Sequence, residues 1–185
     1  MAIPLFLKML VLTDCLVTID AIGCQTDIAD QGGAYILRVK GNQGQLQDDL
    51  QDLLAGCEEI GFVHVPHDYH RTVDKDHGWI EIRECWTLSD RQYLAYLPQR
   101  GVWRDLCTVV KVRRARRLGD QNQDEVGYYI SGFDGSAAQH LKAIRHHWHI
   151  ENCLHWVLDI AFREDTARLR TGHGAENFSV LRHMA

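Results

Sequence analysis

The segment that decides the fold of this chain is LVTIDAIGCQTDIADQGGAYILRVK, from Leu16 to Lys40. Its first apolar and β-branched run, 16–21, predicts a strand, and the residues CQTDIAD that follow Gly23 can begin a helix. A second apolar run at 34–40 predicts another strand. The order strand, helix, strand is typical of two parallel strands joined by a crossover helix, which is the unit of an α/β sheet.

The rest of the chain is predicted to add two long helices and an antiparallel β region. Leucines on one face and acids on the other indicate an amphipathic helix at 46–59, and a segment without Pro or Gly at 136–162 indicates a second helix. The elements expected between them are a hairpin at 69–87 that turns near Gly78, a short helix at 90–97, and strands at 106–117 and 125–131 joined by a polar loop at 118–124. The sequence therefore predicts one α/β domain that contains a β-rich insertion.

The overall composition restricts the class of protein. The 185 residues are 45% apolar and carry a formal net charge of −5, which suits one folded domain and argues against a protein that coats nucleic acid non-specifically. The six cysteines form no Cys-x-x-Cys pair, and the apolar N-terminal segment is too short to span a bilayer and has no basic leader. We expect reduced thiols, no membrane association and a cytoplasmic location.

Two acidic residues occupy positions where metal ions are commonly bound. Asp20 ends the first predicted strand, and ligands collect at the carboxyl ends of strands in open α/β sheets. Glu151 lies beside the apolar stripe of the helix at 136–162, at the border between core and solvent. Together the two acids suggest a divalent-metal site that cleaves phosphodiesters. For each acid alone, a structural role such as capping a turn is the alternative.

The same helix allows a different metal site. His147, Glu151 and His155 are spaced four residues apart along one side of the helix, and zinc accepts their ligand atoms. Residues eight apart are separated by about 12 Å along a helix axis, so the two histidines cannot share one ion without a break in the helix. Packing in the core and contacts with phosphate are the other interpretations of these histidines.

One strongly positive cluster lies in the predicted strand 106–117. It consists of Lys111, Arg113, Arg114, Arg116 and Arg117. Two interpretations are open: a solvated hairpin tip and a contact with the DNA backbone. The nearby Trp103 would suit base stacking, although a tryptophan beside a strand is more often part of the core.

Five segments of the chain together resemble the H-repeat-associated insertion-sequence transposases almost from end to end. The segments are LVTIDAIGCQ from Leu16, GGAYILRVKGNQ from Gly32, DHGWIEIRECW from Asp76, YYISG from Tyr128 and HWHIENCLHWVLDIAFRED from His147. The last segment is the longest and the most specific. This family is similar to the DDE transposases, which share a ribonuclease H-like fold and three acids that bind Mg²⁺ or Mn²⁺.

The resemblance implies roles for particular residues. It makes Asp20 the second and Glu151 the third of the three metal-binding acids, with Mg²⁺ or Mn²⁺ as the cofactor. Residues that match the block around the glutamate are implied to surround the acids or to contact DNA ends. These are Asn152, His155 and Asp159. The family's His-Gly-x-x-Glu-x-Arg block, to which the sequence assigns no role, is matched by His77, Gly78, Glu81 and Arg83.

The chain departs from the family pattern in two places. The family's first acid lies in an Asp-Gly-Lys motif upstream of an Ile-Pro-Leu segment, and here a matching segment lies next to Met1. Asp14 does not match the motif. Between Ala29 and Gly32 the chain also has fewer residues than the family, so the crossover helix is expected to be strained or incomplete.

We therefore expect an N-terminally truncated DDE transposase with an incomplete ribonuclease H-like α/β fold. The core is expected at 1–62 and 132–185, without its first strands, and the β-rich insertion at 63–131, before the last catalytic helix. The family would hydrolyse a phosphodiester and transfer the strand, whereas this chain alone is expected to be inactive because the first acid is missing. The expected partners are DNA, as transposon ends and target, and a second copy of the chain. The alternative is a non-catalytic remnant that binds DNA or a partner.

Overall fold

The structure is a computed structural model that describes residues 12, 15–20, 26–29, 33–76, 79–118, 121–150 and 173. The chain divides into two compact units, 1–143 and 144–185. Nearly all of the described residues belong to the first unit. The N-terminal apolar segment, Asp14, His77, Gly78 and the residues from Glu151 to Gly172 lie outside the described residues.

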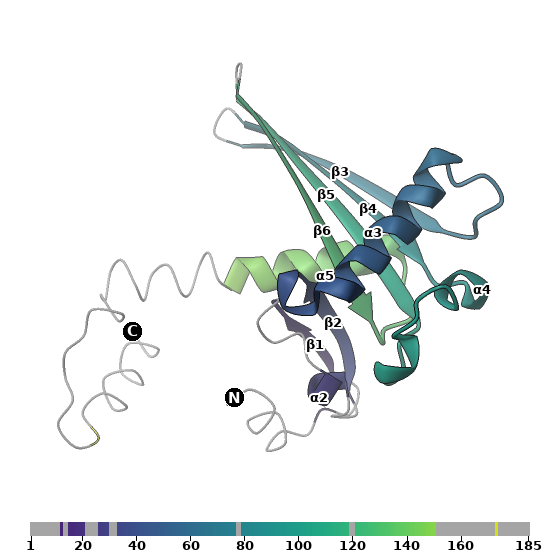
Figure 1. Ribbon diagram of the computed structural model, residues 1–185. Coiled ribbons are helices and arrows are strands. Elements are labelled where there is room, and N and C mark those ends of the chain that lie inside the picture. The colour runs from purple at the N-terminus through teal and green to yellow at the C-terminus, as the bar shows by residue number, and fades with distance from the viewer. Residues whose placement is uncertain are drawn as a thin grey trace. The chain divides into compact units, whose positions relative to one another are not determined.

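A six-stranded sheet forms the centre of the first unit (Figure 1). Its strands lie in the order β1-β2-β6-β5-β4-β3. Their bounds are β1 Leu16–Ile19, β2 Ala34–Val39, β3 Asp68–Asp76, β4 Trp79–Leu88, β5 Thr108–Leu118 and β6 Gln121–Ser131. Neighbouring strands are antiparallel except for β1 and β2, which are parallel. The predicted parallel pair and the predicted hairpin are therefore confirmed.

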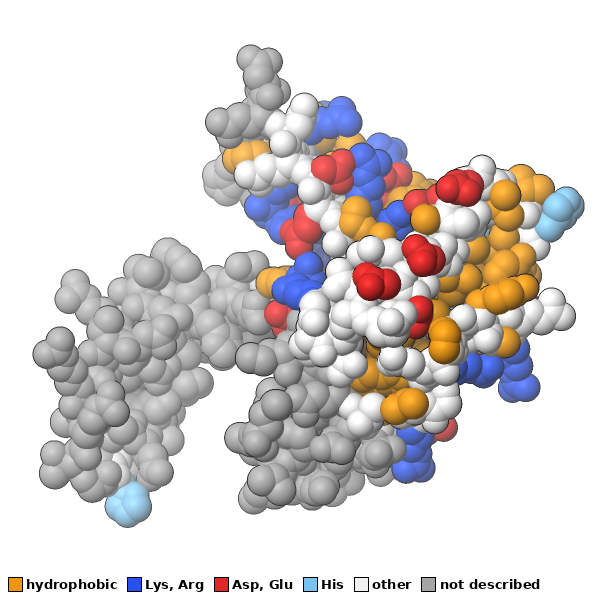
Figure 2. Space-filling view, in the orientation of Figure 1, with side chains coloured by type: hydrophobic (Ala, Val, Ile, Leu, Met, Phe, Trp, Pro, Cys, Tyr) orange, Lys and Arg blue, Asp and Glu red, His pale blue; other side chains and the backbone are white. Residues whose placement is uncertain are grey.

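Two long helices and several short ones accompany the sheet. They are α2 Thr26–Ala29, α3 Gly44–Glu59, α4 Arg91–Leu94 and α5 Ala137–Ile150, with the 3-10 helices η2 Gly41–Gln43 and η3 Arg100–Val102. The predicted amphipathic helix is confirmed in α3, which buries Leu46, Leu50 and Leu54 because they recur on one side of the helix. Its acidic side chains point to solvent in the space-filling view (Figure 2).

The two faces of the sheet are covered by different helices. α3 packs on the face that carries Leu37, Val109 and Ile130, where most of the apolar core lies. The first turn of α5 lies on the opposite face, where the Asp68 carboxylate accepts a hydrogen bond of 2.8 Å from the backbone N–H of Ala137. Because side chains alternate along a strand, each residue of the sheet belongs to one of these faces. We name them the α3 face and the α5 face.

The prediction of a polar loop at 118–124 is wrong. β5 continues to Leu118 and β6 already begins at Gln121, so both strands are longer than their apolar residues indicated. Ion pairs between β5 and β6, such as the one between Arg113 and Asp124, accompany the pairing where apolar burial is absent. The helix predicted at 90–97 is shorter than expected, with α4 limited to Arg91–Leu94 and capped by the Asp90 carboxylate.

Trp103 belongs to the core. Its side chain is only 3% exposed and packs within the main apolar cluster, together with Leu94 and Leu106. This position removes the base-stacking alternative that the sequence left open for this tryptophan. The free thiols of Cys57 and Cys85 are also buried, and burial raises the pKa of Cys85 to about 12.

His140 connects α5 to the sheet. The side chain is fully buried, its Nε2 atom lies 3.2 Å from Ser131 Oγ, and its Nδ1 atom lies 3.0 Å from the carbonyl oxygen of Ser136. Burial lowers the pKa of His140, because the protein interior disfavours the charged imidazolium. The histidine is therefore part of the packing between the helix and the sheet in its neutral form.

Lowering the pH is expected to destabilise the fold through His140. The unfolded side chain has a pKa of about 6.5 and the folded pKa is lower, so the unfolded state binds more protons as the pH falls through this range. The free energy of unfolding of the wild type should fall from about pH 7 to about pH 5 more steeply than that of His140→Gln. Urea denaturation at each pH measures both. Parallel curves for the two proteins would contradict this assignment.

Candidate functional site

Asp20 follows β1 directly, at the carboxyl end of the strand. Its carboxylate is 30% exposed and lies between two cations, with Lys40 Nζ 3.5 Å from Oδ2 and Arg38 Nη1 3.9 Å from Oδ1. Oδ1 is buried and accepts no hydrogen bond from any residue that the structure describes. A buried carboxylate oxygen without a hydrogen bond is costly, and it is also the kind of atom that a divalent cation coordinates.

Arg38 lies at the centre of the charges around Asp20. Its side chain is 8% exposed and its Nη2 atom lies 2.7 Å from Oε1 of Glu125, on the neighbouring strand β6. Arg38 therefore connects the candidate metal-binding acid with a second carboxylate. The guanidinium is hydrogen-bonded to Glu125, whereas its contact with Asp20 is an ion pair at 3.9 Å without a hydrogen bond.

Asp20 lies on the α5 face of the sheet. The register sets Ile19 opposite Leu37, which belongs to the α3 face, so Asp20, the next residue, points to the other side together with Arg38. Ser131, the residue that contacts His140, also belongs to this side because it is paired with Ile36. The first turns of α5 and the Asp20 carboxylate are thus on the same face.

The remaining predicted acid cannot be placed from the structure. Glu151, Asn152, His155 and Asp159 lie outside the described residues. Of the three residues in the zinc alternative, only His147 is described. Within the described ranges, no group of three or more His, Cys, Asp or Glu side chains could hold a metal ion. The divalent-metal site, with two of its implied acids at Asp20 and Glu151, therefore stays a prediction.

The basic cluster of β5 is divided between the two faces of the sheet. Lys111, Arg113 and Arg117 point to the α3 face, and Arg114 and Arg116 point to the α5 face, as the alternation of a strand requires. All of them except Arg117 form ion pairs within the part of the chain that the structure describes. Arg117 is exposed.

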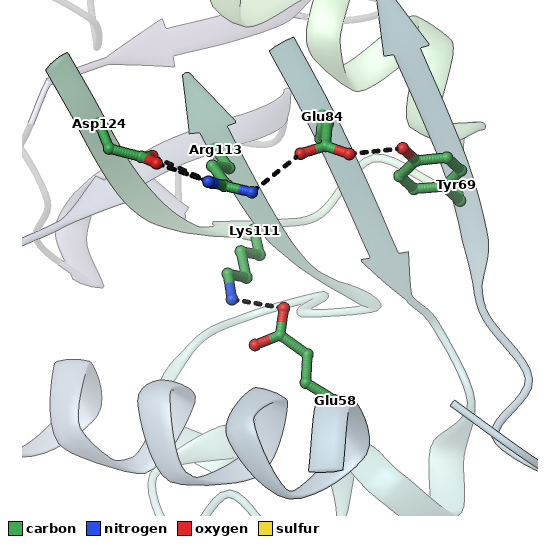
Figure 3. A network of polar contacts seen from close by, with 6 residues as sticks. All are labelled: Glu58, Tyr69, Glu84, Lys111, Arg113 and Asp124. Atoms are coloured by element: carbon green, nitrogen blue, oxygen red, sulfur yellow. Dashed lines mark hydrogen bonds and ion pairs between the residues drawn. The ribbon is translucent and has the colours of Figure 1, made fainter. Parts of the chain in front are cut away.

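On the α3 face, acids neutralise the cluster (Figure 3). Lys111 is 8% exposed, and its Nζ atom lies 2.5 Å from Oε1 of Glu58 in α3 and 5.6 Å above the ring of Trp86. Arg113 lies between Asp124 and Glu84, at 2.5 Å and 3.4 Å. The hydrogen bond from Arg113 lowers the pKa of Asp124.

On the α5 face, one carboxylate collects three arginines. Glu81 forms ion pairs with Arg83, Arg114 and Arg116, and Arg83 also binds Asp74 at 2.7 Å. The sequence alone did not indicate this role of Glu81. The available signal was the alternation of acids and arginines on neighbouring strands, which becomes informative only when the register is known.

Comparison with known proteins identifies the family. The sequence family described as Transposase DDE domain matches residues 2–185. The chain belongs to the DDE transposase family. It is 38% identical over 194 residues to the Escherichia coli K12 protein "H repeat-associated putative transposase YhhI" and 35% identical over 189 residues to "Putative transposase YncI" of Escherichia coli O157:H7. The resemblance to the H-repeat-associated transposases is thus confirmed.

The matched relatives are longer than this DDE transposase chain. Each match covers 100% of the chain, but 50% of the first relative and 48% of the second, so the chain spans about half their length. No solved structure matches the chain. Among the described residues, no helix is both long and apolar enough to cross a membrane.

Removing Lys111 is expected to destabilise the fold. Lys111→Ala deletes the ion pair between the buried Lys111 and the more exposed Glu58, together with the contact with Trp86, and we expect the free energy of unfolding to fall by about 1–3 kcal/mol. The control is Arg117→Ala on the same face of the same strand, which should change it by less than about 0.5 kcal/mol because this side chain is exposed and makes no ion pair with a described residue. Urea denaturation compares the two variants. Similar losses in both would contradict the structural role of Lys111.

Proposed function

We propose that this chain is part of a transposase that acts on the DNA of an insertion sequence by metal-dependent phosphodiester hydrolysis and strand transfer. Its mixed sheet is proposed to be part of a ribonuclease H-like core, with the β-rich insertion at 63–131. Asp20 and Glu151 are proposed to bind Mg²⁺ or Mn²⁺. Asn152, His155 and Asp159 are proposed to support these acids or to contact DNA ends.

The position of Asp20 carries this proposal. Its carboxylate ends a strand of the parallel pair on the face where α5 begins, and the sequence that continues α5 contains Glu151. The carboxyl end of a strand in an open α/β sheet is where ligands and metals collect, because the scaffold is rigid and backbone groups become free there. Membership of the DDE family supports the same pair of acids.

The residues around Asp20 fit a divalent cation in part. The buried Oδ1 atom without a hydrogen bond suits a hard cation, whereas Arg38 and Lys40 already neutralise the carboxylate and would compete with the cation. When bound, Mg²⁺ would stabilise the charge that develops on phosphate oxygens and activate water. Asp20 and Glu151 would hold the ion, beside the Arg38 guanidinium 3.9 Å from the Asp20 carboxylate.

We further propose that the 185-residue chain alone has no or very weak nuclease activity. The chain offers candidates for two of the three acids that the family uses, and no group of three or more His, Cys, Asp or Glu side chains among the described residues could hold a metal ion. With fewer carboxylates, the cations that stabilise the attacking and leaving oxygens are held less firmly. Strand transfer is expected to require segments beyond this half-length of the relatives.

Metal binding and cleavage test this proposal separately. We expect the chain to bind Mn²⁺ weakly, and Asp20→Asn or Glu151→Gln to lower that affinity by about tenfold or more, because each removes a ligand. Electron paramagnetic resonance of free Mn²⁺ measures binding, and Asp52→Asn, on the exposed side of α3, is the matched control. Unchanged affinity in both site variants would refute the metal site. Robust Mg²⁺-dependent cleavage of transposon-end DNA by the chain would refute its inactivity.

The second candidate function is a non-catalytic remnant that binds DNA or a partner. The arginines on the α5 face favour it, because they require neither acid of the metal site. A salt-dependent DNA affinity that survives Asp20→Ala and Glu151→Ala, and yet falls when arginines of β5 are neutralised, is expected for this function. Fluorescence anisotropy with a labelled duplex measures it. A loss of affinity in the two acid variants would instead favour a site that combines DNA and metal.

A further inference from the structure

Glu81 is the meeting point of three guanidinium groups. Its side chain is 11% exposed, and its carboxylate forms ion pairs with Arg83, Arg114 and Arg116, which come from β4 and β5. The Arg114 and Arg116 side chains are 33% and 42% exposed. A nearly buried acid thus holds two arginines that still reach the solvent.

This cluster keeps a positive charge. Among the described residues that these ion pairs join, two carboxylates, Glu81 and Asp74, neutralise three guanidinium groups, so one positive charge remains. Glu125 lies opposite Arg114 in the sheet and is paired with Arg38. Directly behind it, on the α3 face, Lys111 and Arg113 are paired with three carboxylates. The exposed Arg117 is the part of the β5 cluster on that face that could still attract a phosphate. Arg114 and Arg116 therefore belong to a set with excess positive charge, whereas Lys111 and Arg113 belong to a set with excess negative charge.

The two arginines also have unused donors. Hydrogen bonds and ion pairs between Arg114 and described residues use its Nε and Nη2 atoms, and those of Arg116 use its Nε atom. The outer nitrogens of both groups can therefore donate to another anion without releasing Glu81. Paired N–H donors held in a plane match the oxygens of a phosphate group.

The cluster lies on the face that carries Asp20. Arg114 is on β5, which lies three strands from β1 in the sheet. Along β5 it is four residues from Val110, and Val110 lies in the same cross-strand row as Arg38. With about 4.8 Å between strands and about 3.3 Å per residue, the Asp20 and Arg114 backbones are about 20 Å apart. One DNA duplex can span this distance along a single face. Arg113 and Lys111 lie on the α3 face, so they cannot contact a duplex bound along the α5 face.

We propose that Glu81 is a positioning residue that holds Arg114 and Arg116 as a phosphate-binding pair for the DNA backbone. The inference rests on the proposed function, since it takes DNA as the partner of the α5 face. It assigns a role to two members of the block at 77–83: Glu81 orients the arginines of β5, and Arg83 pairs directly with Glu81 while Asp74 holds Arg83. Arg113 and Lys111 are assigned to the stability of the sheet.

A DNA-binding experiment with variants of matched charge tests the proposal. The probe is a fluorescein-labelled 30-base-pair duplex of arbitrary sequence, and anisotropy is measured with the full chain over a series of salt concentrations. Arg114→Ala/Arg116→Ala should lower the affinity by about tenfold and reduce the slope of log affinity against log salt by about 2. The control, Arg113→Ala/Arg117→Ala, removes the same charge from the other face of the strand and should lower the affinity much less. Equal or larger loss in the control would overturn the proposal.

The direction in which Glu81→Gln changes the DNA affinity shows whether Glu81 positions the arginines or only adds negative charge. Removal of a negative charge alone would strengthen DNA binding, whereas loss of the group that orients the arginines should weaken it by about threefold or more. Arg114→Lys/Arg116→Lys keeps the charge without the planar donors and should also weaken binding, which provides a second test if Glu81→Gln unfolds. Circular dichroism checks the fold. Tighter binding by Glu81→Gln, or unchanged binding by the lysine variant, would overturn the proposal.

Two results distinguish failure of the proposed function from failure of the inference about Glu81. If the wild type shows no salt-dependent affinity for the duplex, DNA is not the partner, and both the inference and the proposed function are wrong. If Asp20→Asn and Glu151→Gln leave Mn²⁺ binding unchanged while Arg114 and Arg116 still control DNA affinity, the metal site is wrong and the inference stands.

Discussion

Pairing between β2 and β6 joins two parts of the chain that are far apart in sequence. Ser131 Oγ donates a hydrogen bond of 2.9 Å to the carbonyl oxygen of Tyr35, 96 residues away, and Ile36 pairs with Ser131 in the sheet. The parallel unit of β1 and β2 would otherwise have two strands and no further neighbour among the described residues. A two-stranded unit is marginal in water, so this contact gives the unit a stable sheet to belong to. It also provides Ser131 as the contact of His140, on which the docking of α5 depends.

The outer halves of the long strands are held together in a different way from the core. Near α3, residues such as Leu88, Val109 and Ile130 are fully buried and the sheet is stabilised by apolar packing. Further along β4, β5 and β6, charged residues face one another across neighbouring strands and form ion pairs. Blue and red side chains are accordingly interspersed over the outer part of the sheet in Figure 2. The charged residues of β5 therefore stabilise the sheet whether or not a ligand is bound.

The sequence predicted the elements whose residues carry a local signal. The parallel pair at 16–40 followed from two apolar runs around a short helix, and α3 followed from leucines at helical spacing. The beginning of β6 could not be predicted in this way, because Gln121 to Glu125 are polar and are held in the sheet by pairing with β5. The same limitation applies to the basic cluster. Its residues were recognised, but their division between two faces and their pairing with Glu58, Glu81 and Asp124 depend on register, which one-dimensional sequence does not contain.

The α5 face holds its acids in one consistent electrostatic arrangement. Asp20 lies against Arg38 and Lys40, and Glu81 lies against three arginines, so these two acids are already neutralised by cations. Such a surface binds a free divalent cation only weakly, because the ion has to compete with fixed guanidinium and ammonium groups. The competition between the metal ion and the protein's cations changes when the metal ion binds together with a phosphate. The phosphate supplies negative charge to the arginines while the carboxylate of Asp20 becomes available to the metal. On the proposed function, DNA and metal would therefore favour each other's binding at this face, and the cations around Asp20 would be part of the substrate site as well as of the fold.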